Sequence, residues 1–230
     1  MSPKPVCLLE RSATSIEIMC HPERSTEGTQ SKDLLFAMWA AILFFIMATY
    51  THAQTAPSGE QFETGQKETA HGTRDYKIRM LPLSSFPGLP STIVSGLNEQ
   101  HCLIPQTFEA RRPENVIHGE FEKRGSSDWA MLCSHDGSTK LLVFFSGAFD
   151  KPTTLAEWKD TDRMSSEKPS DDLGSAWGIN TIPPDGMAHT PSVHRHGPFD
   201  HDGIEDDYLE HSSIVHYYRN GNWLALEGNN

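Results

Sequence analysis

The run Asp128-Trp-Ala-Met-Leu-Cys-Ser134, followed after a short polar segment by Leu141-Leu-Val-Phe-Phe145, decides the fold. Both runs are almost wholly apolar, and strands that are apolar on both faces are central strands covered on each side. The segment His135-Asp-Gly-Ser138 between them has the composition of a turn. The sequence therefore predicts an antiparallel meander of three strands, over about residues 115–122, 128–134 and 139–146.

Two helices are expected beside this meander. The first covers about residues 90–101, where Pro90 suits an opening helical turn and apolar residues recur at helical spacing. The second is a short helix over Thr153–Lys159, in which Leu155 and Trp158 would point inward.

The C-terminal region predicts further strands. Trp177–Ile182 is one candidate, and 213–218 and 223–226 flank the pair Asn220-Gly221. Asn-Gly supplies the two positive φ angles of a type I′ turn, so this last pair predicts a β-hairpin. The expected fold class is α+β: a small antiparallel sheet, built from the meander and the C-terminal hairpin, with one or two packed helices.

Residues 34–53 have the pattern of a signal peptide. Leu34–Ala48 is uncharged and apolar, but it is shorter than the roughly 20 residues of a membrane-spanning helix. Lys32 precedes it, and Thr51-His-Ala53 has the small residues of a cleavage site. We expect a periplasmic or extracellular protein without stable membrane insertion after cleavage. An uncleaved N-terminal membrane anchor is the alternative.

The remaining segments are assigned by composition. Residues 1–33 are expected to be a non-native or mis-annotated extension, because Cys20-His-Pro-Glu-Arg-Ser25 resembles peptides translated from repetitive intergenic DNA of some bacteria. Residues 54–75 are rich in Gln, Glu, Thr and Gly and predict a flexible linker. A single domain is expected over residues 76–230.

The composition limits the classes of partner. The 230 residues carry 19 Lys and Arg against 31 Asp and Glu, for a formal net charge of −12. Binding to nucleic acid requires a cationic surface that displaces phosphate counterions, and anionic lipid headgroups require the same. The sequence therefore argues against both partners.

Cys102 and Cys133 are the two cysteines that follow the leader. An exported chain meets an oxidising compartment, where an even pair forms a disulfide. The bond would join the end of the first helix to the second strand of the meander. Metal ligation or a reactive thiol are the rival interpretations, although the close Cys-x-x-Cys spacing of metal sites is absent from the sequence.

A family resemblance rests on three groups of residues: Cys102-Leu-Ile-Pro-Gln106, Asp128-Trp-Ala-Met-Leu-Cys-Ser134 and Asp200-His-Asp-Gly-Ile204. In these, and in the terminal hairpin, the chain resembles a group of uncharacterised secreted bacterial proteins. The resemblance covers most of residues 85–227. It implies an exported, disulfide-bridged small domain and no particular reaction.

Histidine and aspartate are concentrated between residues 189 and 206. His194 and His196 would share a face of an extended segment, and His201 stands between Asp200 and Asp202. These are ligand types that Zn²⁺ accepts, so the five residues are the candidate metal site. The alternative is a solvent-exposed polar loop, because no established metal-binding spacing such as HExxH occurs.

A calcium site is a second interpretation of the same stretch. Asp200, Asp202 and Asp206 could supply oxygen ligands, but the spacing does not match an EF-hand, because Ile204 occupies a ligand position. A turn with aspartate–backbone hydrogen bonds explains these residues equally well. No cofactor is otherwise expected.

The sequence contains no Gly-x-Ser-x-Gly elbow, Walker loop or Gly-x-Gly-x-x-Gly motif. We therefore expect a non-enzymatic binding or interaction domain of the bacterial envelope, with an envelope protein as one type of partner. The alternative is a metal-binding protein or metal-dependent enzyme that uses segment 189–206.

Overall fold

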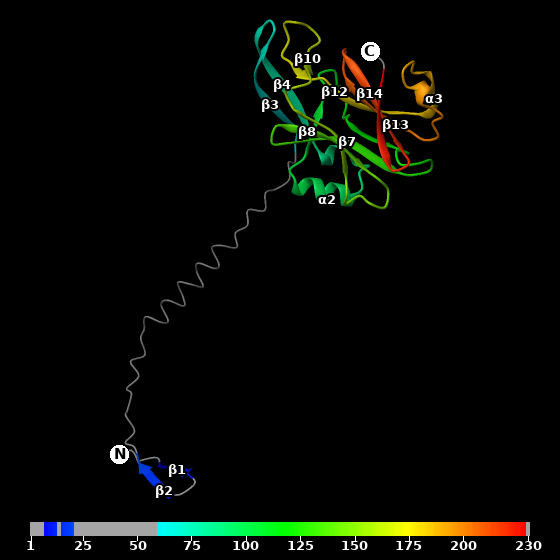
Figure 1. Cartoon of the computed structure of the whole chain (residues 1–230). Coiled ribbons are helices and arrows are strands. Elements are labelled where there is room, and N and C mark those ends of the chain that lie inside the picture. Colours follow the sequence, from blue (N-terminus) through cyan, green and yellow to red (C-terminus); the bar gives the residue numbers. More distant parts are fainter. Residues whose placement is uncertain (1–6, 13–14, 21–58, 229–230) are drawn as a thin grey trace. The chain divides into compact units, whose positions relative to one another are not determined.

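The computed structural model describes residues 7–12, 15–20 and 59–228 (Figure 1). The chain forms two compact units, Met1–Ala53 and Gln54–Asn230. In the first, β1 (Cys7–Ser12) and β2 (Ser15–Cys20) pair as an antiparallel hairpin. The expected signal peptide at 34–53 lies outside the described residues. Among those described, no helix is long and apolar enough to cross a membrane.

The second unit contains a seven-stranded antiparallel sheet. Its main path is β3 (Gln61–Thr69), β4 (Gly72–Pro82), β5 (Leu103–Gln106), β7 (Asp128–His135), β8 (Ser138–Phe144) and β9 (Thr153–Lys159). The seventh strand, β6 (Val116–Gly119), also pairs with β7. The predicted meander is thus confirmed as β6, β7 and β8.

A second sheet has four antiparallel strands in sequence order. They are β12 (Trp177–Ile182), β13 (Gly203–Tyr208), β14 (Ser212–Arg219) and β15 (Asn222–Glu227). The expected strand at Trp177–Ile182 and the C-terminal hairpin are both confirmed. Asn220 and Gly221 have φ angles of 52° and 83°, which are the positive values that the Asn-Gly turn requires.

Helices form a small part of the described chain. The expected first helix is present as α2 (Ser91–Glu99), and a second, α3 (Pro184–His189), follows β12. Short 3₁₀ turns are η1 (Leu83–Ser85) and η2 (His194–His196), and β10 (Met164–Ser165) pairs with β11 (Gly174–Ser175). The small antiparallel sheets with packed helices agree with the expected class, but the fold is dominated by sheet rather than balanced between helix and sheet.

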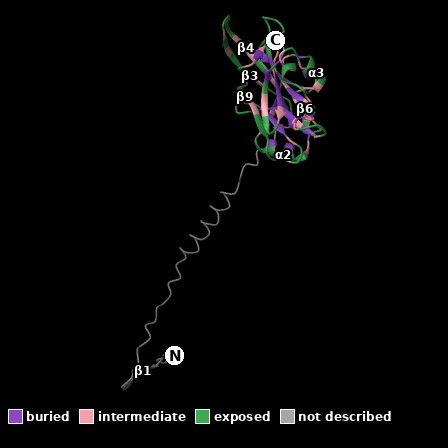
Figure 2. Cartoon of the chain, turned by 45° about the vertical axis from the view of Figure 1, so that its right-hand side comes forward, coloured by how far each residue is buried: buried purple, intermediate pink, exposed green. Residues whose placement is uncertain are grey.

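The side chains of β7 and β8 alternate between two apolar layers. On one face, Met131 and Cys133 pack with α2 through Ile93 and Leu97. On the other face, apolar side chains of both strands pack against the four-stranded sheet: Ala130, Leu132, Leu141, Val143, Trp177, Ile179 and Ile204. Figure 2 shows this buried region running through the middle of the folded unit, while much of the β3–β4 hairpin is exposed.

A third apolar cluster covers the outer face of the four-stranded sheet. Val215, Tyr217 and Leu226 from β14 and β15 pack there against Met187 of α3 and Val193. The order of layers is therefore α2, the seven-stranded sheet, the four-stranded sheet, and the segment that contains α3. Figure 1 shows α2 and α3 on different sides of the two sheets.

Residues Thr153–Lys159 form strand β9, so the expected helix there is wrong. The spacing of Leu155 and Trp158 fits a helix, but the second edge of the buried strand β8 needs backbone hydrogen-bond partners, and β9 supplies them. Leu155 packs partly against the inter-sheet core, whereas Trp158 is 43% exposed.

The expectation of a flexible linker over 54–75 is also wrong where the structure describes it, because β3 and the start of β4 lie there. As an edge strand, β3 exposes most of its side chains, so its sequence lacks apolar alternation. The ring of Tyr76 lies against Gly65, at a distance that would collide with a Cβ atom there. Aromatic cover of a strand glycine stabilises such a pair.

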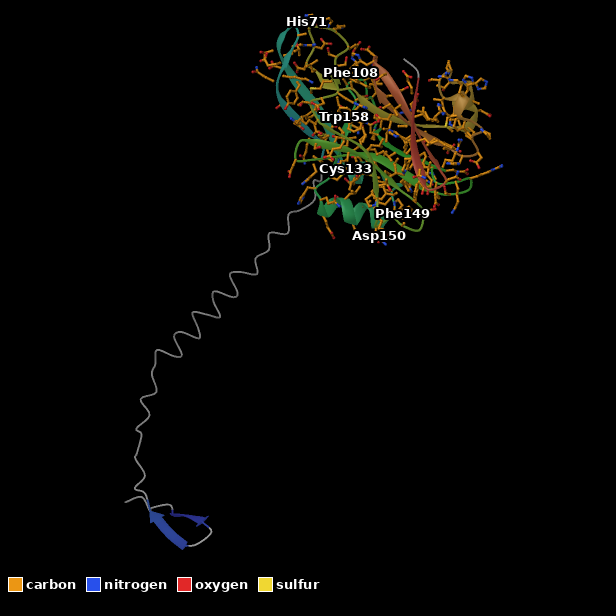
Figure 3. The ribbon with its side chains drawn as sticks, in the orientation of Figure 1. His71, Phe108, Cys133, Phe149, Asp150 and Trp158 are labelled. Carbon is orange, nitrogen blue, oxygen red and sulfur yellow. A yellow bond between two sulfur atoms is a disulfide. The ribbon has the colours of Figure 1, made fainter. Side chains whose placement is uncertain are left out.

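The predicted disulfide between Cys102 and Cys133 is present, and it joins the residues that follow α2 to β7. Figure 3 labels Cys133 within the folded unit. The two cysteines are separated by 31 residues, and both are buried. A bridge across a loop of this length restricts the unfolded chain, which stabilises the fold by about 3–4 kcal/mol in the chain-entropy model.

We expect the double variant Cys102→Ser/Cys133→Ser to lose about 3–4 kcal/mol of unfolding free energy. The measurement is urea denaturation of both proteins, with the wild type also measured in reductant. Reduced wild type and the double variant should have similar midpoints. Equal stability of the oxidised wild type and the variant would show that the bond contributes nothing.

A buried ionic cluster joins the segment between β9 and β10 to the four-stranded sheet at β13. Asp206 is 1% exposed, and its Oδ1 accepts hydrogen bonds from Arg163 Nη1 at 2.5 Å and from Trp177 Nε1 at 2.7 Å. Its Oδ2 lies 3.2 Å from His216 Nε2. Burial alone would raise the pKa of Asp206, but the His216 hydrogen bond and the Arg163 charge hold it below the usual value.

The neighbouring Asp207 is on the opposite face of β13, and none of the ion pairs among the described residues includes it. Burial, with a smaller contribution from the charge of Glu205, raises the pKa of Asp207 to about 6. The folded state therefore binds this proton more tightly than the unfolded state, and stability falls as the pH rises from 3.8 to about 6. Asp206 behaves in the opposite way: its contribution is present above pH 3.8 and is lost as the pH falls through its lowered pKa.

These adjacent residues predict substitutions of opposite sign. At pH 8, Asp206→Asn should lower the unfolding free energy by about 3 kcal/mol, because it leaves Arg163 buried beside a neutral group. Asp207→Asn should raise it by about 1 kcal/mol, after allowance for solvent screening. Urea denaturation at pH 4 and pH 8 tests both, and the gain from Asp207→Asn should vanish at pH 4. Destabilisation by Asp207→Asn at pH 8 would contradict this account.

Candidate functional site

Two of the five predicted metal ligands, Asp200 and His201, lie together. His201 is buried, and its Nδ1 is 2.7 Å from Asp200 Oδ1. The hydroxyl of Tyr217 donates to the same Oδ1 at 2.8 Å and lies 3.0 Å from the His201 Nδ1. The hydrogen bonds from His201 and Tyr217 lower the pKa of Asp200. The two rings also stack, with centroids 4.4 Å apart.

The other three predicted ligands do not join Asp200 and His201. Asp202 Oδ2 accepts a hydrogen bond from the backbone N–H of Glu120 at 3.0 Å. His194 and His196 are exposed on η2, where the carbonyl of His196 accepts from Arg219. Over the described ranges, no group of three or more His, Cys, Asp or Glu side chains is arranged to hold a metal ion. The zinc or calcium site stays a prediction.

Asp200, His201 and Tyr217 line a cavity of about 400 Å³. The Nε2 of His201 is buried and has no hydrogen-bond partner among the described residues. Because Nδ1 faces the Asp200 carboxylate, a proton on Nδ1 donates a hydrogen bond to it. The carboxylate therefore holds the ring in one orientation within the fold.

A larger cavity, of about 740 Å³, lies between the β3–β4 hairpin and the end of β7. Both apolar and polar side chains line it. The lining residues are Gln61, Phe62, Glu63, Met80, His101, Leu103, Ser134, His135, Asp136 and Gly137. Cavities of this size accommodate small organic ligands.

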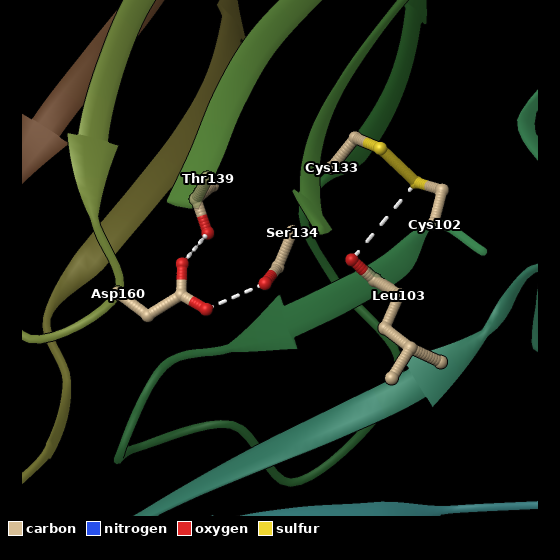
Figure 4. Close-up of a disulfide and its surroundings, with 6 residues drawn as sticks. All are labelled: Cys102, Leu103, Cys133, Ser134, Thr139 and Asp160. Atoms are coloured by element: carbon tan, nitrogen blue, oxygen red, sulfur yellow. Dashed lines mark hydrogen bonds between the residues drawn. A yellow bond between two sulfur atoms is a disulfide. The ribbon is translucent and has the colours of Figure 1, made fainter. Parts of the chain in front are cut away.

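The disulfide borders this cavity. Cys102 stands between the lining residues His101 and Leu103, and Cys133 directly precedes the lining residue Ser134 (Figure 4). Leu103 and Ser134 are also the register partners through which β5 pairs with β7. The covalent bond therefore fixes the spacing of two walls of the cavity.

Beside this cavity lies the buried carboxylate of Asp160. Its Oδ2 accepts a hydrogen bond from Ser134 Oγ and its Oδ1 from Thr139 Oγ1, each at 2.5 Å (Figure 4). Both donors are neutral hydroxyls on β7 and β8. They satisfy the lone pairs of Asp160 without supplying a positive charge.

The carboxyl of Glu63 interacts electrostatically with that of Asp160. Burial raises the pKa of Glu63, and the charge of Asp160 raises it further. Tyr76 donates to Glu63 Oε1 at 3.4 Å, and burial together with the Glu63 charge raises the pKa of this phenol. Glu63 therefore keeps its proton to a higher pH than an isolated glutamate does.

Curvature of the seven-stranded sheet creates this pair. Glu63 is on β3, at one edge of the sheet, and Asp160 follows β9, at the other edge. Lys67 of β3 donates to the carbonyl of Thr161, and Arg74 of β4 donates to Ser166 Oγ at 3.1 Å. The two edges thus meet, and the cavity is the open mouth of an incomplete barrel.

This site was not predicted from the sequence. Glu63 lies in the segment expected to be a linker, and Asp160 begins a run that looks like a polar loop. One signal was present: Ser134 and Thr139 are polar residues in strands predicted to be buried, and buried hydroxyls require partners. That signal indicates a polar partner but does not identify it.

No protein-family model, curated protein or solved structure matches this chain. The resemblance to uncharacterised secreted bacterial proteins therefore stays a prediction. The class of protein that the fold and site define is a disulfide-bridged, two-sheet domain with a polar cavity at the mouth of an incomplete barrel.

The carboxyl pair predicts a pH-dependent effect of Glu63→Gln. Because the pKa of Glu63 is raised in the folded state, its ionisation costs stability as the pH rises through that pKa. The variant mimics the protonated acid, so its melting temperature relative to wild type should rise between pH 4 and pH 8. Differential scanning fluorimetry measures this directly.

Glu68→Gln is the matched control, because Glu68 is on the same strand, is exposed and contacts Thr73 instead of Asp160. Its melting temperature should follow that of the wild type at every pH. A constant loss of stability in Glu63→Gln across the pH range would contradict the raised pKa of Glu63.

Proposed function

We propose that this chain is an exported, non-enzymatic binding domain of the bacterial envelope that takes a small molecule in the mouth of its barrel. The observation that carries this proposal is the cavity of about 740 Å³, whose walls are joined by the Cys102–Cys133 bond. Walls that are fixed before binding reduce the entropy lost when a ligand is ordered.

Export is supported by two independent features. The apolar run Leu34–Ala48 with the small residues Thr51-His-Ala53 fits a cleaved leader. The disulfide is typical of proteins in oxidising compartments. The acidic net charge of −12 favours a small-molecule or protein ligand over nucleic acid or an anionic membrane surface.

The cavity itself favours binding over catalysis. Ser134 and Thr139 donate hydrogen bonds to Asp160, and Tyr76 donates one to Glu63. The hydrogen-bond partners of both carboxyl groups are thus hydroxyl groups of the protein. Met80 and Leu103 provide apolar wall beside polar groups, as ligand pockets commonly do.

The proposal predicts that substitution at the cavity mouth blocks small molecules. Gln61 is exposed on β3 and lines the cavity, so Gln61→Trp should obstruct it. The probes are hexylamine, hexanol and hexanoate, which share one chain length and differ in charge. At least one should shift the backbone amide NMR signals of Leu103, Ser134 and Gly137 in the wild type, and Gln61→Trp should abolish those shifts.

Gln66→Trp is the control for the added indole. Gln66 is also exposed on β3, but it contacts Asp75 and does not line the cavity. Its probe-induced shifts should equal those of the wild type. If none of the three probes perturbs the cavity residues, the proposed function is wrong.

A further inference from the structure

The cavity at the barrel mouth has an acidic lining. Glu63 and Asp136 contribute carboxylates, and the buried Asp160 lies beside Glu63. The lining residues include His101 and His135 but no Lys or Arg. A concave site with carboxylates and no fixed cation attracts positively charged ligands.

The charge at Glu63 has no protein cation to balance it. Among the ion pairs of the described residues, none includes Glu63 or Asp160. Lys67, on the same strand, donates instead to the carbonyl of Thr161. Burial and the charge of Asp160 both disfavour the ionised form of Glu63, so at low pH a proton on Glu63 takes the place of a cation.

The described groups that face Glu63 from the other elements supply no fixed positive charge to compensate its carboxylate. Tyr76 of β4 is a neutral hydrogen-bond donor whose pKa is raised by burial and by Glu63. At the turn after β7, His135 Nε2 is 3.1 Å from Asp136 Oδ2, so these two groups pair with each other. His101, which follows α2, is the remaining titratable lining residue.

The apolar part of the wall accommodates the body of a ligand. Met80 and Leu103 belong to β4 and β5 and line the same cavity as Glu63. Methionine adapts to ligands of different shape, because its side chain is unbranched and flexible. The cavity therefore combines a carboxyl group with an apolar surface.

We propose that the ligand is a small organic amine, whose ammonium group pairs with the Glu63 carboxylate while its apolar body lies against Met80 and Leu103. This inference rests on the proposed function and specifies its ligand class. No covalent bond forms: one ammonium ion enters, up to one proton leaves Glu63 for solvent, and the Glu63 carboxylate is then ionised. Binding and proton release are consequently linked.

The direction of the pH dependence follows from this exchange. Burial and Asp160 raise the pKa of Glu63 above 4.5, so at lower pH the amine must displace a proton that is tightly held. Amine affinity should therefore rise as the pH increases through that raised pKa and become constant above it. A neutral ligand of the same length should not follow this profile.

The test is isothermal titration calorimetry of the full protein with hexylamine and hexanol, in buffers of different ionisation enthalpy. At pH 8 hexylamine should bind at least about tenfold more tightly than hexanol, as expected for a hydrogen bond to a charged group. At a pH below the Glu63 pKa, the apparent enthalpy should depend on the buffer, because binding releases protons. Glu63→Gln should remove both the preference for the amine and the proton release.

Two controls separate other causes. Glu68→Gln leaves the cavity unchanged and should bind hexylamine like the wild type. His135→Gln tests the histidine at the rim, and the pH profile should persist in this variant. Tighter hexylamine binding that survives Glu63→Gln would overturn the inference.

The outcomes also distinguish this inference from the proposed function. If hexanol or hexanoate binds in the cavity as tightly as hexylamine, the amine class is wrong while the binding function stands. If no probe binds there, both proposals fail.

Discussion

Strand β7 has to bury both of its faces, and the rest of the structure depends on that constraint. Met131 and Cys133 require cover on one face, which α2 provides, while Ala130 and Leu132 require the four-stranded sheet on the other. Full burial of a side chain of the size of Met131 or Leu132 contributes about 1.5–3 kcal/mol. The layer order of the domain follows from the alternation in this one strand.

The same strand carries the groups that build the cavity. Cys133 ties β7 to the residues after α2, and Ser134 next to it donates to Asp160. β5 pairs with β7 at Leu103 and Ser134, and both of these residues line the cavity. Other parts of the wall come from β3, from Met80 of β4 and from the turn that follows β7. The disulfide and the candidate binding site therefore use adjacent residues at the end of β7.

Much of the fold could be predicted because its signals are local. The double-sided apolar pattern of β7 and β8 indicates central strands, and Asn220-Gly221 indicates the last hairpin. The disulfide followed from cysteine count and expected compartment. Strand β9 could not be predicted in this way, since the spacing of Leu155 and Trp158 also fits a helix. Its conformation is decided by the unpaired edge of β8, which is a tertiary effect.

The candidate site was harder to predict than the fold. Asp200 and His201 do lie together, but adjacency in sequence did not bring His194, His196 or Asp202 to them. Glu63 and Asp160 are far apart in sequence and meet because the seven-stranded sheet curls until its edges touch. Curvature of that kind depends on the whole sheet, so it cannot be predicted from the local sequence of β3 or of the residues after β9.

Taken together, the disulfide-bridged walls, the apolar surface and the uncompensated carboxyl pair describe a site prepared for a small cation. The measurement that tests this most directly is a crystal structure of the oxidised protein grown with hexylamine. The account predicts the ammonium group within about 2.7–3.2 Å of the Glu63 carboxylate, with the alkyl chain against Met80 and Leu103. Amine bound only elsewhere, or a protein cation paired with Glu63 in its place, would contradict it.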